Sequence, residues 1–130
     1  MSNEFRTPLS RARGLGSAKH GAAHWIAERV SALALIPLVL WAVFGVIRLA
    51  RADFDTAVAW LASPLNAVLM ILLILVAFWH MQTGVRVIIE DYIHKMLTKS
   101  VLLVANLFVV SLAGALAIFS ILKVALGGAL

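Results

Sequence analysis

Three long stretches of this chain contain no charged side chain, and they limit what the chain can fold into. They are residues 30–47, 56–85 and 100–122, and each is flanked by charged residues. An α-helix rises about 1.5 Å per residue, so helices of this length match the roughly 30 Å of hydrocarbon in a bilayer. The sequence therefore predicts an all-α integral membrane protein with three transmembrane helices, with spans near 29–49, 64–92 and 100–123.

The composition supports lipid as the main surrounding medium. Of the 130 residues, 63% are hydrophobic and 13% are charged, whereas about 25% of the residues of a soluble domain are charged. The length fits one domain. We expect residues 1–28 to form a basic tail outside the lipid and residues 29–130 to form a single membrane domain.

The distribution of basic residues predicts the orientation of the chain, because loops rich in Lys and Arg face the cytoplasm. Most of them lie in the tail and after the second span, namely Arg6, Arg11, Arg13, Lys19, Arg29, Arg86, Lys95 and Lys99. We therefore expect a cytoplasmic N-terminus and an external C-terminus. The net charge of +5 comes from residues that flank apolar spans, so it indicates topology and not nucleic-acid binding.

The chain contains no cysteine, and this narrows the cofactors that it can hold. An iron–sulfur cluster bound by thiolates and a haem attached through a CxxCH motif are both excluded. Any haem would have to be bound non-covalently, by histidine or methionine.

His80 lies inside the second uncharged stretch, where an imidazole is costly unless it contacts protein, water or a metal. Two interpretations are open. The Nε2 atom of His80 is an axial ligand of a b-type haem, or the imidazole forms a hydrogen bond between helices. At about 100° per residue, Gly84 and Asp91 lie on the His80 side of the helix, and the glycine leaves room for a planar ligand.

One histidine fills one axial position of a haem, so a redox haem in this chain implies a second ligand. His24 is one candidate for this ligand. It precedes the first span and therefore lies at a different depth from His80. We expect the second ligand to come from a partner membrane subunit. Interfacial anchoring beside Trp25 is the other interpretation of His24.

Three further polar residues lie at the predicted cytoplasmic ends of the spans. Arg29 can pair with haem propionates or can mark the positive flank of the first span. Tyr92 can donate a hydrogen bond to a quinone carbonyl, and Asp91 can connect that site with bulk protons. The alternative interpretations are an interfacial aromatic for Tyr92 and a solvated charge for Asp91.

Together these features resemble the family of hydrophobic membrane anchor subunits of succinate dehydrogenase, respiratory complex II. The resemblance lies in the segment RARGLGSAKHGAAHWIAERVSA and in the pattern H-x(3)-G-x(6)-D-Y-x-H, which runs from His80 through Asp91 and Tyr92 to His94. It covers nearly the whole chain, and three spans with the N-terminus inside also fit the family.

The resemblance implies roles for these residues. His80 would be one axial ligand of haem b, and a cytochrome b556 subunit would supply the other. Tyr92 would hydrogen-bond ubiquinone, with Asp91 beside it. Arg29 would lie near the haem propionates or the quinone pocket.

The resemblance also implies a place in an enzyme complex. The chain would attach a flavoprotein subunit and an iron–sulfur subunit to the bacterial inner membrane, as part of the tricarboxylic acid cycle and the respiratory chain. Because it has no dicarboxylate or flavin motif, it would not oxidise succinate by itself. Alternatives are an anchor subunit of fumarate reductase, a small transport subunit with His80 as proton relay, and a structural anchor without a cofactor.

Overall fold

The computed structural model describes residues 7–9 and 21–127. Four helices follow one another along the second range: α2 Gly21–Leu49, α3 Phe54–Ala62, α4 Pro64–Tyr92 and α5 Met96–Ala125. The described residues contain no β-strand. The predicted all-α fold class is therefore confirmed.

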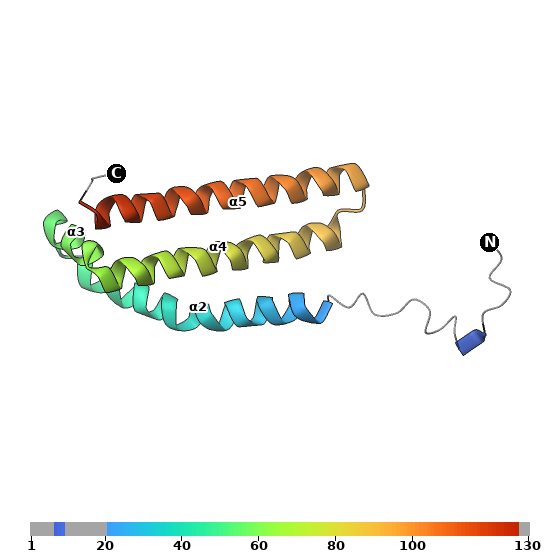
Figure 1. The fold of residues 1–130 in the computed structure, drawn as a ribbon, viewed down its shortest axis with the longest axis horizontal. Coiled ribbons are helices and arrows are strands. Elements are labelled where there is room, and N and C mark those ends of the chain that lie inside the picture. Colours follow the sequence, from blue (N-terminus) through green and yellow to red (C-terminus); the bar gives the residue numbers. More distant parts are fainter. Residues whose placement is uncertain (1–6, 10–20, 128–130) are drawn as a thin grey trace.

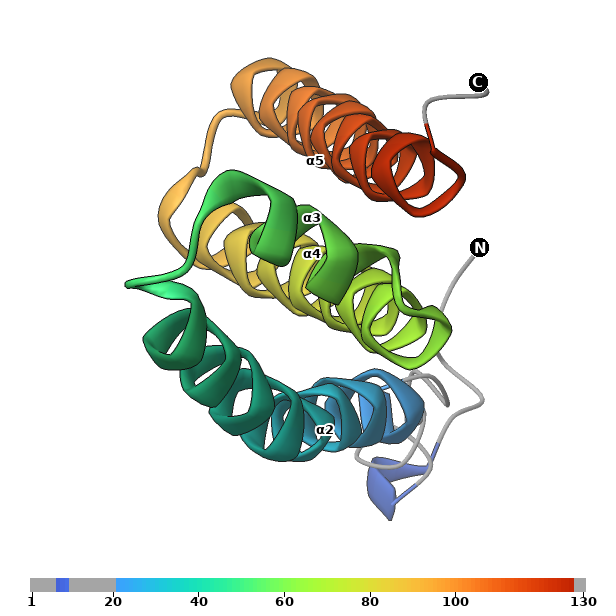
Figure 2. The ribbon, with the colours of Figure 1, turned by 90° about the vertical axis from the view of Figure 1, so that its left-hand side faces the viewer.

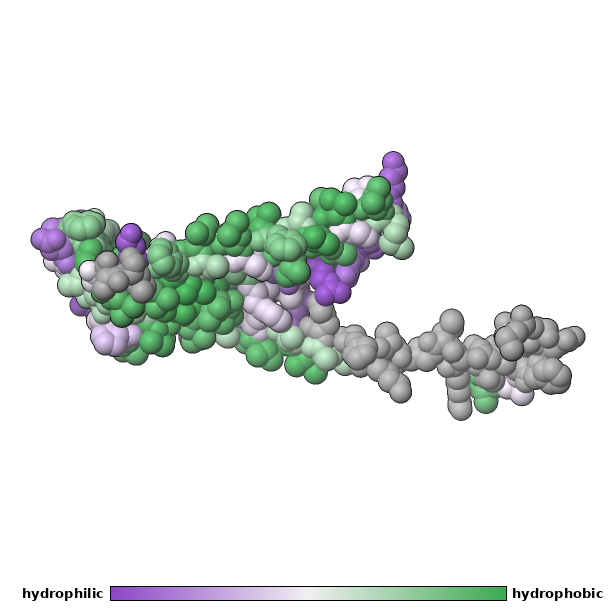
Figure 3. Space-filling model, turned by 45° about the horizontal axis from the view of Figure 1, so that its top comes forward, coloured by the Kyte–Doolittle hydropathy of each residue, from purple (hydrophilic) through white to green (hydrophobic). Residues whose placement is uncertain are grey.

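Three segments of these helices are long and apolar enough to cross a membrane. They are Trp25–Leu49, Pro64–Tyr92 and Met96–Ala125, with mean hydropathies of 2.5, 2.1 and 2.5. Figure 3 shows apolar side chains along the flank of the helices and hydrophilic ones gathered toward the ends. Large apolar residues are widely exposed, including Phe108 at 68% and Phe44 at 66%. Such a surface is stable in lipid, and three membrane-spanning helices are what the sequence predicts.

The helices extend beyond the predicted spans at the start of α2 and at both ends of α5, which continues to Ala125. α2 begins at Gly21, eight residues before the predicted span, so residues 21–28 are helical although the sequence assigned them to the tail. α5 begins at Met96 and not at residue 100. The predicted spans were placed by charge, but Arg and Lys are good helix formers. A charged residue therefore ends an apolar run without ending the helix.

The second uncharged stretch is divided between two helices, and the sequence analysis did not predict the first of them. α3 begins after Asp53, whose carboxylate accepts a hydrogen bond of 3.0 Å from the Thr56 amide. It ends at Ala62, and the next residue, Ser63, has extended backbone angles (φ −63°, ψ 134°). The residue before a proline disfavours helical angles, whereas proline suits the first helical turn. Pro64 therefore starts a new helix.

The three long helices lie in a row with α4 in the middle (Figures 1 and 2). α4 contacts both α2 and α5, and α3 lies across one end of the row, where it contacts α4 and α5. We call this the α3 end. The opposite end, where α2 begins, α4 ends and α5 begins, we call the Tyr92 end (Figure 1). Within the described chain the buried apolar residues are Leu38, Ala67, Ile89 and Val110, so the row leaves most of its apolar surface for lipid or other subunits.

Two glycines allow close contacts between helices, as expected for small residues in membrane proteins. A Cβ at Gly45 would stand 2.9 Å from Trp60 Cζ2. A Cβ at Gly114 would stand 3.4 Å from the ring of Phe78. The first contact joins α2 to α3 and the second joins α5 to α4.

Candidate functional site

His80 lies on the side of α4 that faces α2. Its Nδ1 atom is 3.0 Å from the hydroxyl of Ser31 on α2. Ser31 is buried, with 8% of its surface exposed, although it is polar. Sequence reasoning did not single out Ser31, because a serine in an apolar helix has no local signal of its distant partner. The contact occupies one ring nitrogen and leaves Nε2 for another partner.

One turn from His80, toward the Tyr92 end, α4 carries a glycine, Gly84. Apart from its chain neighbours and the backbone of its own helix, no described atom lies within 4 Å of the position that a Cβ at Gly84 would take. The buried hydroxyl of Thr83 donates to carbonyls of its own helix, at 3.1 Å to Trp79 and 2.9 Å to His80. The side chain of Thr83 is therefore satisfied locally, and Gly84 borders open space beside the imidazole.

Asp91 and Tyr92 lie at the Tyr92 end, away from His80. Tyr92 is the last residue of α4 and is 76% exposed. Along the helix axis it is about 18 Å from His80, from a rise of 1.5 Å per residue. Its carbonyl is 3.1 Å from the Nδ1 atom of His94. The chain thus presents two separate places for chemistry, one within a span and one at its end.

The structure does not bring Arg29 beside His80. The Arg29 guanidinium lies over the ring of Trp25, 5.3 Å from the centroid. Residues two positions apart on a helix point about 200° apart around its axis, so Arg29 lies on nearly the opposite side of α2 from Ser31. A role for Arg29 toward haem or quinone stays a prediction, and it requires a ligand that extends around α2. The backbone of His24 belongs to α2, but its side chain lies outside the described part of the chain.

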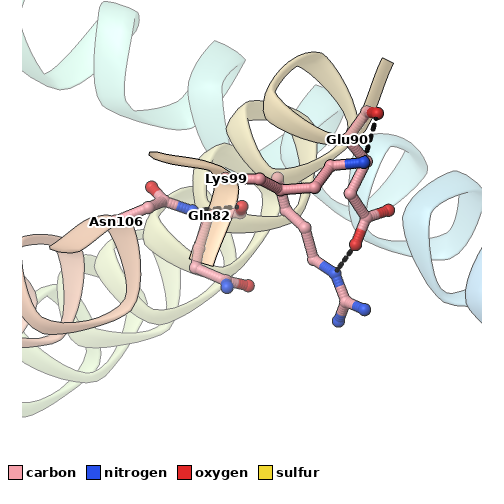
Figure 4. Close-up of polar contacts among 5 residues, drawn as sticks. Gln82, Glu90, Lys99 and Asn106 are labelled. Atoms are coloured by element: carbon pink, nitrogen blue, oxygen red, sulfur yellow. Dashed lines mark hydrogen bonds and ion pairs between the residues drawn. The ribbon is translucent and has the colours of Figure 1, made fainter. Parts of the chain in front are cut away.

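Polar contacts join the end of α4 to α5, and the sequence analysis did not predict them (Figure 4). Lys99 Nζ donates to the Glu90 carbonyl at 2.7 Å, and the Glu90 carboxylate accepts from Arg86 at 2.8 Å. Farther from the Tyr92 end, the Asn106 side-chain amide donates to the Gln82 backbone carbonyl at 3.0 Å. The bonds of Lys99 and Asn106 hold α5 against the second half of α4, whereas the pair of Arg86 and Glu90 lies within α4. An isolated asparagine in an apolar run was the available signal.

A groove of about 330 Å³ lies between α4 and α5. Its lining is apolar and aromatic, with Gln82 and Ser111 as polar members. Gln82 lies about 160° around α4 from His80, from about 100° per residue. The groove is therefore separated from the imidazole by the body of α4.

The donor set at His80 fits one axial position of a haem and does not form a complete metal site. No group of three or more His, Asp or Glu side chains that could hold a metal occurs among the described residues. A metal at His80 therefore needs ligands from outside the described residues, such as those of a macrocycle or a partner subunit. The free Nε2 atom and the open space at Gly84 are compatible with a planar group.

The chain is similar to known proteins over most of its length. The family model for the succinate dehydrogenase/fumarate reductase transmembrane subunit matches residues 3–122. The succinate dehydrogenase hydrophobic membrane anchor subunit of Paracoccus denitrificans is 30% identical over 95% of each chain. The anchor subunit of Rickettsia conorii is 31% identical over 83% of this chain and 87% of its own. That of Reclinomonas americana is 30% identical over 64% of this chain and 72% of its own.

No solved structure matches the chain significantly. The family is therefore assigned from sequence, and the three spanning helices agree with it. The family match covers most of the chain, and the relative from Paracoccus denitrificans aligns over nearly its full length. The chain accordingly belongs to the family of succinate dehydrogenase/fumarate reductase transmembrane subunits.

Proposed function

We propose that this chain is the membrane anchor subunit of a succinate dehydrogenase, in a bacterial inner membrane. The relatives named above carry this role in their names, and three spanning helices suit a multi-pass anchor. The chain has no cysteine, so the thiolates of iron–sulfur clusters belong to another subunit. It works as part of an oxidoreductase and does not oxidise succinate alone.

The contact of His80 with Ser31 carries the haem part of the proposal. His80 would hold haem b through Nε2, since Nδ1 is occupied by the hydroxyl 3.0 Å away. The open space at Gly84 accommodates part of the macrocycle. A bound haem supplies one-electron redox chemistry. A second ligand would come from the cytochrome b556 subunit, as the resemblance of the chain to its family implies.

The second part of the proposal concerns ubiquinone. Reduction of a quinone consumes two electrons and two protons, and the protons must come from water. Tyr92 is exposed at the end of a spanning helix, where a lipid-soluble headgroup meets the aqueous phase. Its phenol donates a hydrogen bond to a quinone carbonyl, and the carboxylate of Asp91 connects the site with bulk protons.

The partners follow from the surface that the row leaves open. A cytochrome b556 subunit covers part of the apolar surface around α2 and α4, which brings its haem ligand toward His80. The iron–sulfur and flavoprotein subunits lie on the cytoplasmic side, at the Tyr92 end. Arg86, Lys95 and Lys99 lie at that end, which supports a cytoplasmic orientation by the positive-inside rule.

A fumarate reductase anchor is the second candidate, because the matching family includes both enzymes. The same residues would serve either direction of electron flow. The names of the relatives favour succinate dehydrogenase.

Replacement of His80 tests the haem assignment. In the purified complex of His80→Ala, the haem content per flavin should fall close to zero, measured by absorbance of the reduced pyridine haemochrome. His94→Ala is the matched control, since His94 is exposed and its one hydrogen bond among the described residues is with the Tyr92 carbonyl. Wild-type haem content in an assembled His80→Ala complex would refute the assignment.

A further inference from the structure

The contact between His80 and Ser31 is part of a short chain of hydrogen bonds. The Ser31 hydroxyl lies 2.8 Å from the Glu28 carbonyl, three residues earlier on α2. The same hydroxyl lies 3.0 Å from His80 Nδ1 on α4. Ser31 is buried, so water does not compete easily for either contact. One hydroxyl thus bridges a helix backbone and an imidazole that lies 49 residues away in the sequence.

Counting hydrogens determines the direction of both bonds. A carbonyl oxygen only accepts, so the contact with Glu28 uses the single hydrogen of the Ser31 hydroxyl. The second contact then needs a hydrogen from the imidazole. A neutral imidazole carries one N–H, and here it must be on Nδ1. The Nε2 atom is left with its lone pair, as a metal ligand requires.

We propose that Ser31 is a positioning residue, which holds His80 as the Nδ1–H tautomer and aims its Nε2 lone pair at the haem iron. The inference rests on the proposed function, since it assumes that His80 is the axial ligand. A ligating histidine commonly donates its other N–H to an acceptor, which fixes the ring orientation and raises its basicity. Here the acceptor is a neutral hydroxyl whose own hydrogen is committed to Glu28.

Two effects follow from loss of the hydroxyl. A less basic imidazole stabilises ferric haem less, so the reduction potential of the haem should rise. The ring also loses its fixed orientation, so haem should be retained about 10–100-fold more weakly, the usual effect of removing such a partner. Both effects concern the haem itself and do not depend on turnover of succinate.

The test compares variants of the assembled complex that differ in the hydroxyl. Ser31→Ala and Ser31→Val lack it, whereas Ser31→Thr keeps it and has nearly the shape of valine. Ser120→Ala is the matched control, because Ser120 donates to the Leu116 carbonyl at 2.8 Å without a histidine partner among the described residues. The readouts are the haem content per flavin after gel filtration and a spectroscopic redox titration of the haem.

We expect Ser31→Ala and Ser31→Val to lose haem on dilution and to show a raised potential, and Ser31→Thr and Ser120→Ala to resemble the wild type. Wild-type potential and retention in Ser31→Ala, in a complex where His80→Ala removes haem, would overturn the inference and leave the proposed function intact. Haem retained in His80→Ala would overturn both. Failure of the hydroxyl-free variants to assemble, although His80→Ala assembles, would assign Ser31 to folding and overturn the inference.

Discussion

The contact between Gly45 and Trp60 gives a quantitative prediction about packing at the α3 end. In Gly45→Ala, the new Cβ would meet Trp60 Cζ2 at 2.9 Å and Cη2 at 3.0 Å. The indole cannot move away easily. It stacks on Trp41 with centroids 5.5 Å apart, and the Trp60 carbonyl accepts from the Asn66 amide at 2.8 Å. The methyl group must therefore displace a ring that packs against Trp41, on a residue whose backbone is held by Asn66.

Two opposing terms determine the size of the effect. Replacing glycine by alanine inside a helix stabilises by about 1 kcal/mol, whereas overpacking costs about 1–3 kcal/mol. Gly45→Ala should therefore lie between neutral and about 2 kcal/mol destabilising. Gly114→Ala is the matched comparison, because its Cβ would meet the Phe78 ring at 3.4 Å, close to ordinary contact. It should be neutral or stabilising.

The assay is thermal dissociation of the purified complex in one detergent, followed by gel filtration or intrinsic fluorescence. The midpoint temperature of Gly45→Ala should lie below that of Gly114→Ala. The double variant Gly45→Ala with Trp60→Phe should lose less stability than the sum of the losses in the two single variants, because the smaller ring makes room for the methyl group. A midpoint for Gly45→Ala at or above that of Gly114→Ala would refute the proposed clash.

Two further predictions concern the ends of α4 and α3. Tyr92→Phe should lower succinate–ubiquinone activity by up to about tenfold, the equivalent of one hydrogen bond of about 1.4 kcal/mol, with little change toward a soluble artificial acceptor. Equal loss of both activities would indicate faulty assembly instead. The Thr56 hydroxyl and amide lower the pKa of Asp53 below its usual 3.8. This cap therefore stabilises α3 at pH values above 3.8, and the stabilisation is lost as the pH falls through the lower pKa of the folded state. Thermal melts of wild type and Asp53→Asn should therefore differ in their pH dependence only in acid, and parallel curves down to that range would contradict the cap.

Local sequence was sufficient for the helices that cross the membrane, because hydropathy is a sum over neighbouring residues. It was less reliable at their ends. The first spanning helix, α2, starts at Gly21 and continues through Arg29, since a charged residue limits lipid contact but not helix formation. α3 was missed because its residues continue the apolar run before Pro64, and hydropathy alone cannot separate a short helix from a span.

The residues of the candidate site were likewise only partly predictable from the sequence. His80 could be selected from the sequence, because an imidazole among apolar residues is unusual within a span. Asp91 and Tyr92 could be selected only as one of two interpretations, because an aromatic residue at the end of a span is also a common interfacial anchor. Arg29 was also selected, yet the structure places it over Trp25 on nearly the opposite side of α2 from Ser31. Its proximity to a ligand depends on the rotation of the helix and on the partner subunit.

The sequence by itself determined the class of the protein, its three spans and the residues with unusual chemistry, because each of these depends on nearby residues and on their transfer between water and lipid. Only the tertiary structure decided that Ser31 lies beside His80 and that Asn106 bonds to the backbone of α4. Such pairs depend on the relative depth and rotation of two helices. Those quantities arise from packing along whole helices, and no short segment of the sequence contains them.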